Sequence, residues 1–502
     1  MSEENALAKR FNDAWPLWAV LISQAVLTVP WLWRTAPFTD EALYLEAGHA
    51  EWAHWLHHVH GQDYASWFSG APTLYPPLAA AADSAGGLPA ARAVSLVLMF
   101  ATTALIYLMG GRLFNRLIGG LAGALFAVGG LGVHYGAFAT FGPFALFFLT
   151  LAAWAAIRVR DGGFGWLPLC ALALVTANAA KYATLPWDPV VVLLLVLHGW
   201  DSGRWEAIGR ACSVTATVLI IEGGLLVLGG ADYARGLVAT TLFRSIHWGA
   251  PSSAASVLAR AFLLTGVLVL ATALGVVLSV LKHRPKALTL FLCVLLLAAV
   301  LAPIEQARIH QLPSLDKNIG FGLPFAALGA GYALGEGRSW LGRRLAGGRL
   351  IAAGASIVVL VAVLVSGRLE GVQFRGPGIV VAGQIVTAIR HSYRPGTYVI
   401  SDGGARMEQY YLPRIPQQNW IGMFATGEGA RDRIANQISC GEVSVIVLRK
   451  SAGSYDHPYD KSIARLLNGS GRATLAAVAT QGSYSTEVYR MASPGGRSGG
   501  CG

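Results

Sequence analysis

Residues 287–303 have the sequence ALTLFLCVLLLAAVLAP, seventeen consecutive residues without an aspartate, glutamate, lysine or arginine. An uncharged run of this length is long enough to cross the hydrocarbon core of a bilayer, which is roughly 30 Å thick. Inside that core, a helix is the structure that satisfies its backbone hydrogen bonds within a single segment. The stretch therefore predicts a membrane-spanning helix.

The composition of the whole chain indicates the same class of protein. Of its 502 residues, 54% are hydrophobic and only 13% are charged, whereas soluble globular proteins carry about 25% charged residues. Further uncharged stretches recur along the chain and predict a polytopic α-helical membrane protein with about eleven spans. The predicted spans are 15–33, 93–110, 117–133, 141–157, 166–180, 183–198, 211–229, 261–281, 287–303, 319–335 and 350–366.

The basic residues between these spans predict the orientation of the chain. Cytoplasmic loops of membrane proteins are enriched in lysine and arginine, and here alternate loops counted from the N-terminus carry most of them. They are Lys9, Arg10, Arg112, Arg116, Arg158, Arg160, Arg204, Arg210, Lys282, Arg284, Lys286, Arg338, Arg343, Arg344 and Arg349. We therefore expect a multi-pass protein of the plasma membrane, with a cytoplasmic N-terminus and with everything after about residue 367 outside. The net charge of +11 follows from this anchoring and indicates no nucleic-acid partner.

Two domains and a tail are expected. Residues 1–369 form a transmembrane domain, whose longer extracytoplasmic loops are 35–92, 230–260 and 304–318. Residues 370–491 form a small soluble extracytoplasmic α/β domain, and residues 492–502 are glycine-rich and predict a disordered tail.

Helices and strands alternate in the predicted C-terminal domain, which favours a parallel sheet of a few strands. Helices are expected at 377–392, 428–438 and 459–468, and strands at 397–401, 444–448 and 484–490. Asp402, Gly403 and Gly404 follow the first strand and predict a turn, because they complete no dinucleotide-binding fingerprint. The five cysteines have no CxxC spacing and are expected to be packing residues and unpaired thiols.

The first extracytoplasmic loop contains a candidate catalytic site. Thr39, Asp40 and Glu41 begin a helix-compatible stretch directly after the first span, and Tyr44 follows on the same face one turn later. Thr39 is a candidate N-cap, and acidic residues are favoured in a first helical turn, so that capping alone explains both carboxylates. A carboxylate partly removed from water at this position is also suited to act as a general base or to bind a metal ion.

Two further residues on the same predicted side are candidates for substrate binding. Tyr75 belongs to a proline-rich segment, residues 70–77, which is predicted to be rigid and extended. This segment either shapes a substrate site or simply connects the loop to the next helix. Lys181 occupies a tight turn between two spans, where it either binds a phosphate or extends towards lipid headgroups.

The loop at 304–318 is the most polar stretch between two spans. It contains Glu305, Arg308, His310 and Lys317 within fourteen residues. Arginine supplies planar bidentate donors for phosphate, and lysine supplies a mobile point charge. These residues therefore either hold a lipid-linked phosphate or form an internal cluster of salt bridges.

The order of these features resembles the GT-C superfamily of membrane glycosyltransferases. The motifs that carry the resemblance are Thr39-Asp40-Glu41-Ala42-Leu43-Tyr44 after the first span and Tyr75-Pro76-Pro77 before the second. Within the superfamily, the chain looks most like the bacterial transferases related to protein O-mannosyltransferases and to the aminoarabinose transferases that modify lipid A. The resemblance covers nearly the whole chain, although outside these motifs it depends on order and topology.

The resemblance implies a glycosyltransferase that moves a sugar from a polyprenyl-phosphate donor to an extracytoplasmic lipid, glycan or protein hydroxyl. It implies that Asp40 is the base and that Glu41 assists it or positions the acceptor. The cations, which are Lys181, Arg308, His310 and Lys317, would then neutralise the phosphate as the sugar leaves. The sequence requires no cofactor, and a divalent cation is the one candidate.

One position departs from the family pattern. Related transferases commonly carry a second acidic residue at the outer start of the fourth span, where this chain has Gly142. Either another carboxylate, such as Asp188, Glu222 or Glu305, takes this role, or the transfer chemistry is altered or lost. Two alternatives therefore stay open: a GT-C-like scaffold that binds a lipid-linked substrate, and a lipid transporter or flippase. The sequence shows no internal repeat of the kind that transporters often have.

Overall fold

The structure is a computed structural model that describes residues 3–59, 62–162, 165–200, 203–241, 251–312, 314–370, 377–401, 406–422, 429–451, 454–455 and 458–493. The chain divides into two compact units. The helical unit consists of Met1–Leu32 and Ala47–Gln373, and the C-terminal unit consists of Trp33–Glu46 and Phe374–Gly502. The second boundary of the helical unit falls inside helix α2 (Thr39–His57).

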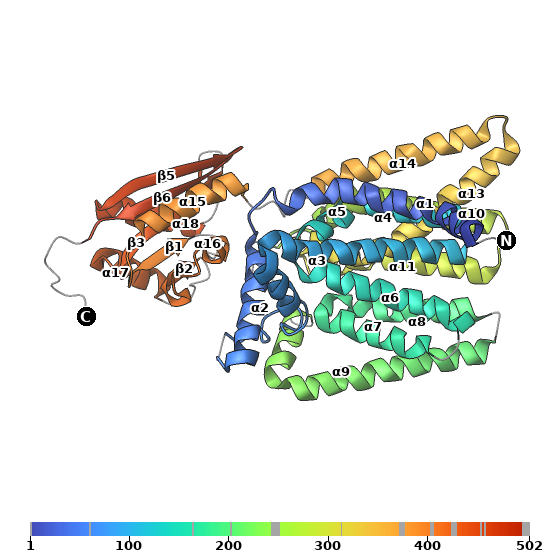
Figure 1. Ribbon diagram of the computed structural model, residues 1–502, viewed down its shortest axis with the longest axis horizontal. Helices are drawn as coiled ribbons and strands as arrows, with labels where there is room; N and C mark the ends of the chain where they lie inside the picture. The colour runs from blue at the N-terminus through green and yellow to red at the C-terminus, as the bar shows by residue number, and fades with distance from the viewer. Residues whose placement is uncertain are drawn as a thin grey trace. The chain divides into compact units, whose positions relative to one another are not determined.

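The helical unit is a bundle of long apolar helices (Figure 1). Within the described ranges, eight segments are long and apolar enough to cross a membrane. They are α1 (Glu3–Thr28) with η1 (Val29–Leu32), α3 (Tyr75–Leu113), α6 (Phe141–Gly162), η2 (Tyr182–Trp187) with α8 (Asp188–Gly199), α9 (Arg204–Thr240), α10 (Ala254–Leu281), α11 (Lys286–Arg308) and α14 (Gly348–Glu370). A ninth is possible if α4 (Arg116–Val128) and α5 (Gly130–Ala137), which meet at a bend of 60°, form one span.

The two remaining predicted spans are helices that do not meet this standard of length and apolarity. The span expected at 166–180 is α7 (Trp166–Ala180), which has only 15 residues. The span expected at 319–335 is largely α13 (Leu323–Arg344), which is rich in glycine and alanine. A β-carbon on Gly329 would lie 2.4 Å from Thr272, and one on Gly335 would lie 2.5 Å from Ile118. Small residues of this kind let helix backbones approach closely in membranes, so that α13 packs between its neighbours instead of facing lipid.

Two of the long helices bend at glycine. Gly87 in α3 and Gly230 in α9 both have φ of +67°, a left-handed conformation that glycine adopts without a steric penalty.

The prediction of an extended segment at 70–77 is wrong at its end, because Tyr75, Pro76 and Pro77 form the first turn of α3. Proline is well tolerated there, since its missing N–H and fixed φ suit the first positions of a helix.

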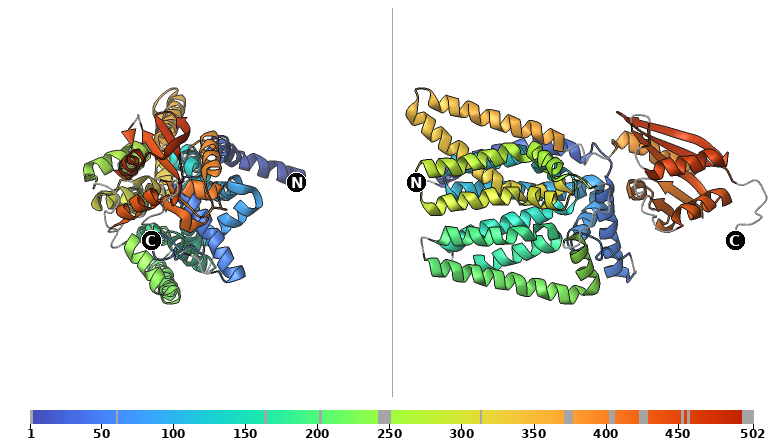
Figure 2. Two further views of the ribbon diagram at one scale, coloured as in Figure 1. Left: turned by 90° about the vertical axis from the view of Figure 1, so that its left-hand side faces the viewer. Right: turned by 180° about the vertical axis from the view of Figure 1, so that it is seen from behind.

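The outward faces of several spans carry exposed apolar side chains. On α9, Val227 is 81% exposed and Leu228 is 87% exposed, and rows of leucine, isoleucine and valine continue on α10 and α14. Large exposed apolar surfaces are unfavourable in water and normal in lipid. The chain is therefore a multi-pass membrane protein, and Figure 2 shows its long helices running side by side.

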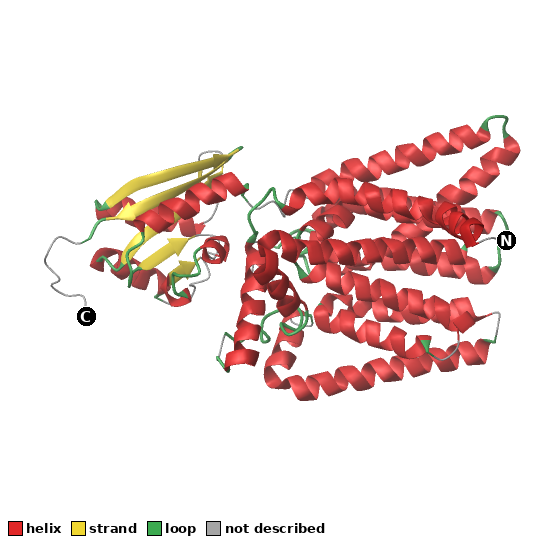
Figure 3. Ribbon diagram, viewed as in Figure 1, coloured by secondary structure: helices red, strands yellow, loops and turns green. Residues whose placement is uncertain are grey.

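The C-terminal unit is a sheet between two layers of helices, and the described strands all belong to it (Figure 3). The strands are β1 (Tyr398–Ser401), β2 (Trp420–Gly422), β3 (Val443–Ser451), β4 (Ser454–Tyr455), β5 (Ala473–Gln481) and β6 (Tyr484–Met491). Their order is β2-β1-β3-β6-β5, with β4 paired to β3. β1 is parallel to β2 and β3, whereas β6 is antiparallel to β3 and β5. The predicted parallel sheet is therefore wrong for the last hairpin, which turns at Gly482 with a φ of +62°.

Alternation along β3 assigns the two layers of helices. Val445 and Val447 pack with α15 (Ile379–Ser392), whereas Ile446 and Leu448 pack with α17 (Ala430–Cys440) and α18 (Pro458–Ser470). Successive side chains of a strand point to opposite faces, so that each face has its own apolar core. The three helices and three strands expected from the sequence are all present.

Three smaller expectations concern the ends of this unit. The turn at Asp402, Gly403 and Gly404 and most of the predicted tail lie outside the described residues. The expectation of unpaired thiols holds for Cys170, Cys212 and Cys293. It is wrong for Cys440, which is disulfide-bonded.

Candidate functional site

The turn that carries Lys181 is fixed from two sides. Lys181 follows the end of α7, where its backbone N–H donates to the carbonyl of Ala177 at 2.9 Å. The loop before α3 pairs with this turn through two backbone hydrogen bonds. The Ala71 N–H donates to the carbonyl of Ala179 at 2.7 Å, and the Tyr182 N–H donates to the carbonyl of Ser69 at 3.0 Å. A β-carbon on Gly70 would lie 1.9 Å from the carbonyl oxygen of Ala180. Only glycine therefore allows the two backbones to meet here.

A buried amide beneath this turn bridges two carboxylates. The Asn178 Nδ2 group donates to Asp188 Oδ2 at 2.8 Å and to Glu222 Oε1 at 2.7 Å. Thr184 Oγ1 lies 2.7 Å from Asn178 Oδ1 and 2.9 Å from the carbonyl oxygen of Lys181. Asp188 and Glu222, which were candidates to replace the acidic residue missing at Gly142, therefore belong to a network that supports the Lys181 turn.

The structure brings Lys181 to the same segment as Lys317. The Lys181 Nζ atom lies 5.3 Å from the centre of the Phe321 ring, within the range of a cation–π interaction. Phe321 belongs to η4 (Ile319–Gly322). This element directly follows α12 (Leu315–Asn318), which contains Lys317. Both lysines are half-buried. Two of the predicted phosphate-binding cations therefore flank one short stretch of chain.

Tyr135 fills the space beside Gly142. A β-carbon on Gly142 would lie 3.2 Å from two carbon atoms of the Tyr135 ring, and one on Gly320 would lie 2.6 Å from its hydroxyl oxygen. The Tyr135 hydroxyl donates to the carbonyl oxygen of Lys317. Sequence reasoning did not single out Tyr135. The signal that could have found it is the pair of glycines, Gly142 and Gly320, that its ring requires on either side.

Asp316 is a buried carboxylate that the sequence analysis also passed over. Its side chain is fully buried, and Arg260 Nη2 donates to its Oδ2 atom at 3.1 Å. Burial raises the pKa of Asp316 above its ordinary value, and the hydrogen bond and charge of Arg260 offset part of that rise. Among the described residues, Asp316 Oδ1 and Arg260 Nε are buried without a hydrogen-bond partner. The pair thus keeps one acceptor and one donor available for a further polar group.

The outer part of the loop at 304–318 pairs internally. Arg308 donates through Nε and Nη2 to both carboxylate oxygens of Glu305, at 2.8 and 2.7 Å. His310 Nδ1 lies 3.0 Å from the carbonyl oxygen of Ser252, and Ser252 N–H donates back to the His310 carbonyl at 3.1 Å. Glu305, Arg308 and His310 therefore make local contacts at the surface. For Glu305 and Arg308, this contact is the internal salt bridge that was one of the two expectations for the loop.

Tyr75 lies inside the helical unit. Its ring is fully buried and packs against Phe141 and Phe144, at centroid distances of 5.8 and 6.1 Å. Its hydroxyl group lies 3.0 Å from Ser95 Oγ. In this position Tyr75 anchors the start of α3 against the first turn of α6, at Phe141 and Phe144.

Asp40, Glu41 and Tyr44 occupy the first part of α2, in the C-terminal unit. Asp40 and Tyr44 are half-buried, whereas Glu41 is fully buried. Within the described residues, no three His, Cys, Asp or Glu side chains come together as ligands for a metal ion. No chemical step is assigned to a divalent cation.

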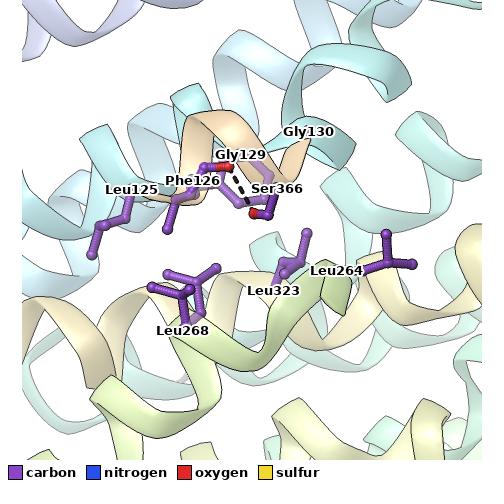
Figure 4. A pocket seen from close by; sticks show the side chains of 10 residues that line it. Leu125, Phe126, Gly129, Gly130, Leu264, Leu268, Leu323 and Ser366 are labelled. Atoms are coloured by element: carbon purple, nitrogen blue, oxygen red, sulfur yellow. Dashed lines mark hydrogen bonds between the residues drawn. The ribbon is translucent and has the colours of Figure 1, made fainter. Parts of the chain in front are cut away.

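An apolar pocket lies at the break between α4 and α5 (Figure 4). Leu125, Phe126, Leu264, Leu268 and Leu323 line it, with Ser366 as a polar member. The space between these side chains, open solvent included, is about 310 Å³, and little of it is wide enough for a water molecule. Its small width and lack of charge exclude it as a phosphate site.

No family model matches this sequence, and no curated protein matches it either. Solved structures do match. ArnT from Cupriavidus metallidurans in the apo state has a TM-score of 0.59 and 16% sequence identity, over 96% of this chain and 98% of that chain. The ArnT structure bound to undecaprenyl phosphate has a TM-score of 0.58 and 13% identity, over 95% and 97% of the two chains.

An archaeal enzyme matches as well. The oligosaccharyltransferase AglB from Archaeoglobus fulgidus, in complex with an inhibitory peptide and a dolichol-phosphate, has a TM-score of 0.58 and 12% identity, over 88% of this chain and 69% of that chain. At these identities the similarity concerns the fold. This chain therefore shares the fold of ArnT over nearly its whole length.

Proposed function

We propose that this protein transfers a sugar from a polyprenyl-phosphate donor to the hydroxyl group of a lipid, glycan or protein acceptor. The observation that carries the proposal is the match to ArnT, which extends over 96% of this chain and 98% of that one. A fold alone does not fix a function. The proposal must therefore also name the residues that carry out the transfer.

The proposed reaction exchanges one bond at the anomeric carbon. The acceptor oxygen forms a bond to that carbon, the bond from the carbon to the phosphate oxygen breaks, and the polyprenyl phosphate leaves with its negative charge. Asp40 takes the acceptor proton, and Glu41, next to it and fully buried, positions the acceptor with Tyr44. Asp40 is half-buried, and a carboxylate that is partly withdrawn from water is suited to proton transfer.

The cations of the helical unit are proposed to bind the phosphate. Lys181 and Lys317 flank the segment 317–321, where fixed positive charge would stabilise the leaving group most as it develops charge. Arg308 and His310 already have protein partners, so that a phosphate would compete with Glu305 and Ser252 for them. Lys181 and Lys317 are therefore the stronger candidates.

We further propose that the C-terminal unit lies outside the cytoplasm. Arginine and lysine gather at the predicted cytoplasmic loops, as the positive-inside rule expects. The disulfide at Cys440 supports the same orientation, because disulfides persist mainly in oxidising compartments.

One observation favours a second candidate function. Tyr135 occupies the space beside Gly142, so that a carboxylate at this point of the fold is replaced by an aromatic ring. A GT-C-like scaffold that binds a lipid-linked substrate without transferring its sugar is the alternative that this replacement suggests.

Turnover assays decide between the two functions. Lipids that co-purify with the protein are identified by mass spectrometry, and sugar-loaded forms of the same carriers are then offered as donors. We expect the wild type to release polyprenyl phosphate and Asp40→Asn to lose at least about 100-fold in kcat while keeping its melting temperature. Tight lipid binding without turnover of any donor would favour the scaffold.

A further inference from the structure

The chain segment that carries Asp40 is built into the C-terminal unit. Thr35 forms an antiparallel bridge with Gly378. Ala36 N–H donates to the carbonyl of Pro377 at 2.9 Å, and Ile379 N–H donates to that of Arg34 at 3.4 Å. Ala36 is fully buried in the same apolar core as the α15 residues. The start of the segment, just before α2, is thus fixed by backbone contacts to the start of α15.

Glu46 fixes the other end of the segment. Its Oε2 atom accepts a hydrogen bond from Arg406 Nη1 at 2.5 Å, and its Oε1 atom accepts one from Gln417 Nε2 at 2.6 Å. Arg406 begins α16 (Arg406–Tyr411), and Gln417 begins η5 (Gln417–Asn419). The side chains of Glu46 and Arg406 are only 28% and 16% exposed, so that solvent screens this ion pair less than one on an open surface.

The first turns of α2 lie between these two anchors. Asp40 precedes Glu46 by six residues, which corresponds to about 9 Å along a helix. A helix held at its start by backbone pairing and on its second turn by a charged clamp has little freedom to rotate or shift. The orientation of Asp40 and Glu41 is therefore set by elements that lie more than 300 residues later in the chain, since Glu46 and Arg406 are separated by 360 residues.

We infer that Arg406 and Gln417 are positioning residues, which act through Glu46 to hold the proposed base in its reactive orientation. The inference rests on the proposed function, because it needs Asp40 to be the base. It assigns the later part of the C-terminal unit, residues 374–502, a part in catalysis that does not require these residues to touch the substrate. A displacement of about 1 Å at a reacting group is enough to slow chemistry about 100-fold.

Steady-state kinetics with a matched control test this inference. Arg406→Gln removes the charge of the clamp, whereas Lys450→Gln removes the charge of a comparable pair in the same unit, in which Lys450 Nζ lies 2.6 Å from Glu487 Oε1. We expect Arg406→Gln to lower kcat at least about tenfold with little change in KM for the donor. Lys450→Gln should keep kcat within about twofold of the wild type. The exchanged pair Glu46→Arg with Arg406→Glu should recover part of the loss.

Hydrogen exchange supplies a readout that does not depend on turnover. Peptides covering residues 39–46 should exchange faster in Arg406→Gln and at the wild-type rate in Lys450→Gln, because only the first variant frees α2. Faster exchange with an unchanged kcat would overturn the inference and leave the proposed function standing. A wild type without turnover would overturn the proposed function instead, and exchange alone would then show whether the C-terminal unit orders this helix. An equal loss of kcat in both variants would show a general loss of folding and would also overturn the inference.

Discussion

Tyr135 shows how one residue changes the chemistry that a fold offers. Its ring stands where a side chain at position 142 would begin, and its hydroxyl group binds the backbone of Lys317. The departure at Gly142 was visible in the sequence, but its occupant was not. Tyr135 precedes Gly142 by seven residues and belongs to another helix, so that no local pattern connects the two positions.

Gly142→Asp is expected to destabilise the protein. The new β-carbon would come within 3.2 Å of the Tyr135 ring, and displacing a packed ring costs about 1–3 kcal/mol. Thermal unfolding in detergent should show a lower melting temperature. Combining the change with Tyr135→Ala should remove the clash, so that the cost of Gly142→Asp becomes smaller in that background. An equal cost in both backgrounds would contradict the role given to Tyr135.

Asp316 gives a prediction about pH. Its pKa is raised in the folded state because burial disfavours the charged carboxylate. At low pH, Asp316 is protonated in both the folded and the unfolded state. As the pH rises above the ordinary aspartate pKa of about 3.9, the carboxyl group ionises more readily in the unfolded state, which lowers the free energy of unfolding. The unfolding free energy of the wild type relative to Asp316→Asn should therefore fall as the pH increases through the raised pKa. A difference that stays flat or grows between pH 4 and pH 8 would contradict this reading of Asp316.

At the scale of elements, the turn between α7 and η2 depends on a loop that lies 110 residues earlier in the chain. Ser69 and Ala71 pair with this turn through their backbones, and Gly70 leaves the necessary space. Lys181 stood out in the sequence as a cation between two spans. The groups that hold it, which include Asn178 and Thr184, could not be recognised because each looks like an ordinary helix residue.

Gly70→Ala should disturb this turn. Its β-carbon would lie 1.9 Å from the carbonyl oxygen of Ala180, which is backbone and cannot rotate away. We expect a lower melting temperature and a higher KM for the donor, because Lys181 moves. Gly223→Ala is the matched control, since a β-carbon there meets nothing within 4 Å. Alanine also stabilises a helix by about 1 kcal/mol relative to glycine. A neutral Gly70→Ala would show that the loop is not held against α7.

At the scale of the whole molecule, composition and charge predicted the class of protein. Eight of the eleven expected spans correspond to the candidate spans among the described residues, and a ninth does so if α4 and α5 count as one span. Of the two that differ, α7 is apolar but has only 15 residues, whereas α13 is largely buried among other helices, so that its sequence need not be strongly apolar. In the C-terminal sheet, the strands β1, β3 and β6 were predicted, whereas β2, β4 and β5 were not. Of the last hairpin, only β5 (Ala473–Gln481) was missed, because it has an exposed face and little apolar alternation.

The proposed sidedness of the membrane is testable by cysteine labelling. His391 lies exposed on the C-terminal unit and Arg204 lies exposed at the start of α9. In intact cells, a membrane-impermeant maleimide should label His391→Cys, whereas Arg204→Cys should react only after the membrane is opened. Wild-type protein, which retains its native cysteines, is the control. Labelling of Arg204→Cys in intact cells would reverse the orientation proposed here.

The contact between Glu46 and Arg406 also has a consequence for how the protein is made. The ribosome completes residues 33–46 before it reaches Arg406, which follows Glu46 by 360 residues. At about 5–20 residues per second, the 360 residues keep this segment waiting for roughly 20 to 70 seconds before its partners are made. During that time the first spans are already in the bilayer, while the helix with Asp40 lacks the contacts that hold it. A nascent chain that is released early would therefore be an inserted protein with an unfinished Asp40 helix, and biosynthesis itself would delay activity until the last domain has folded.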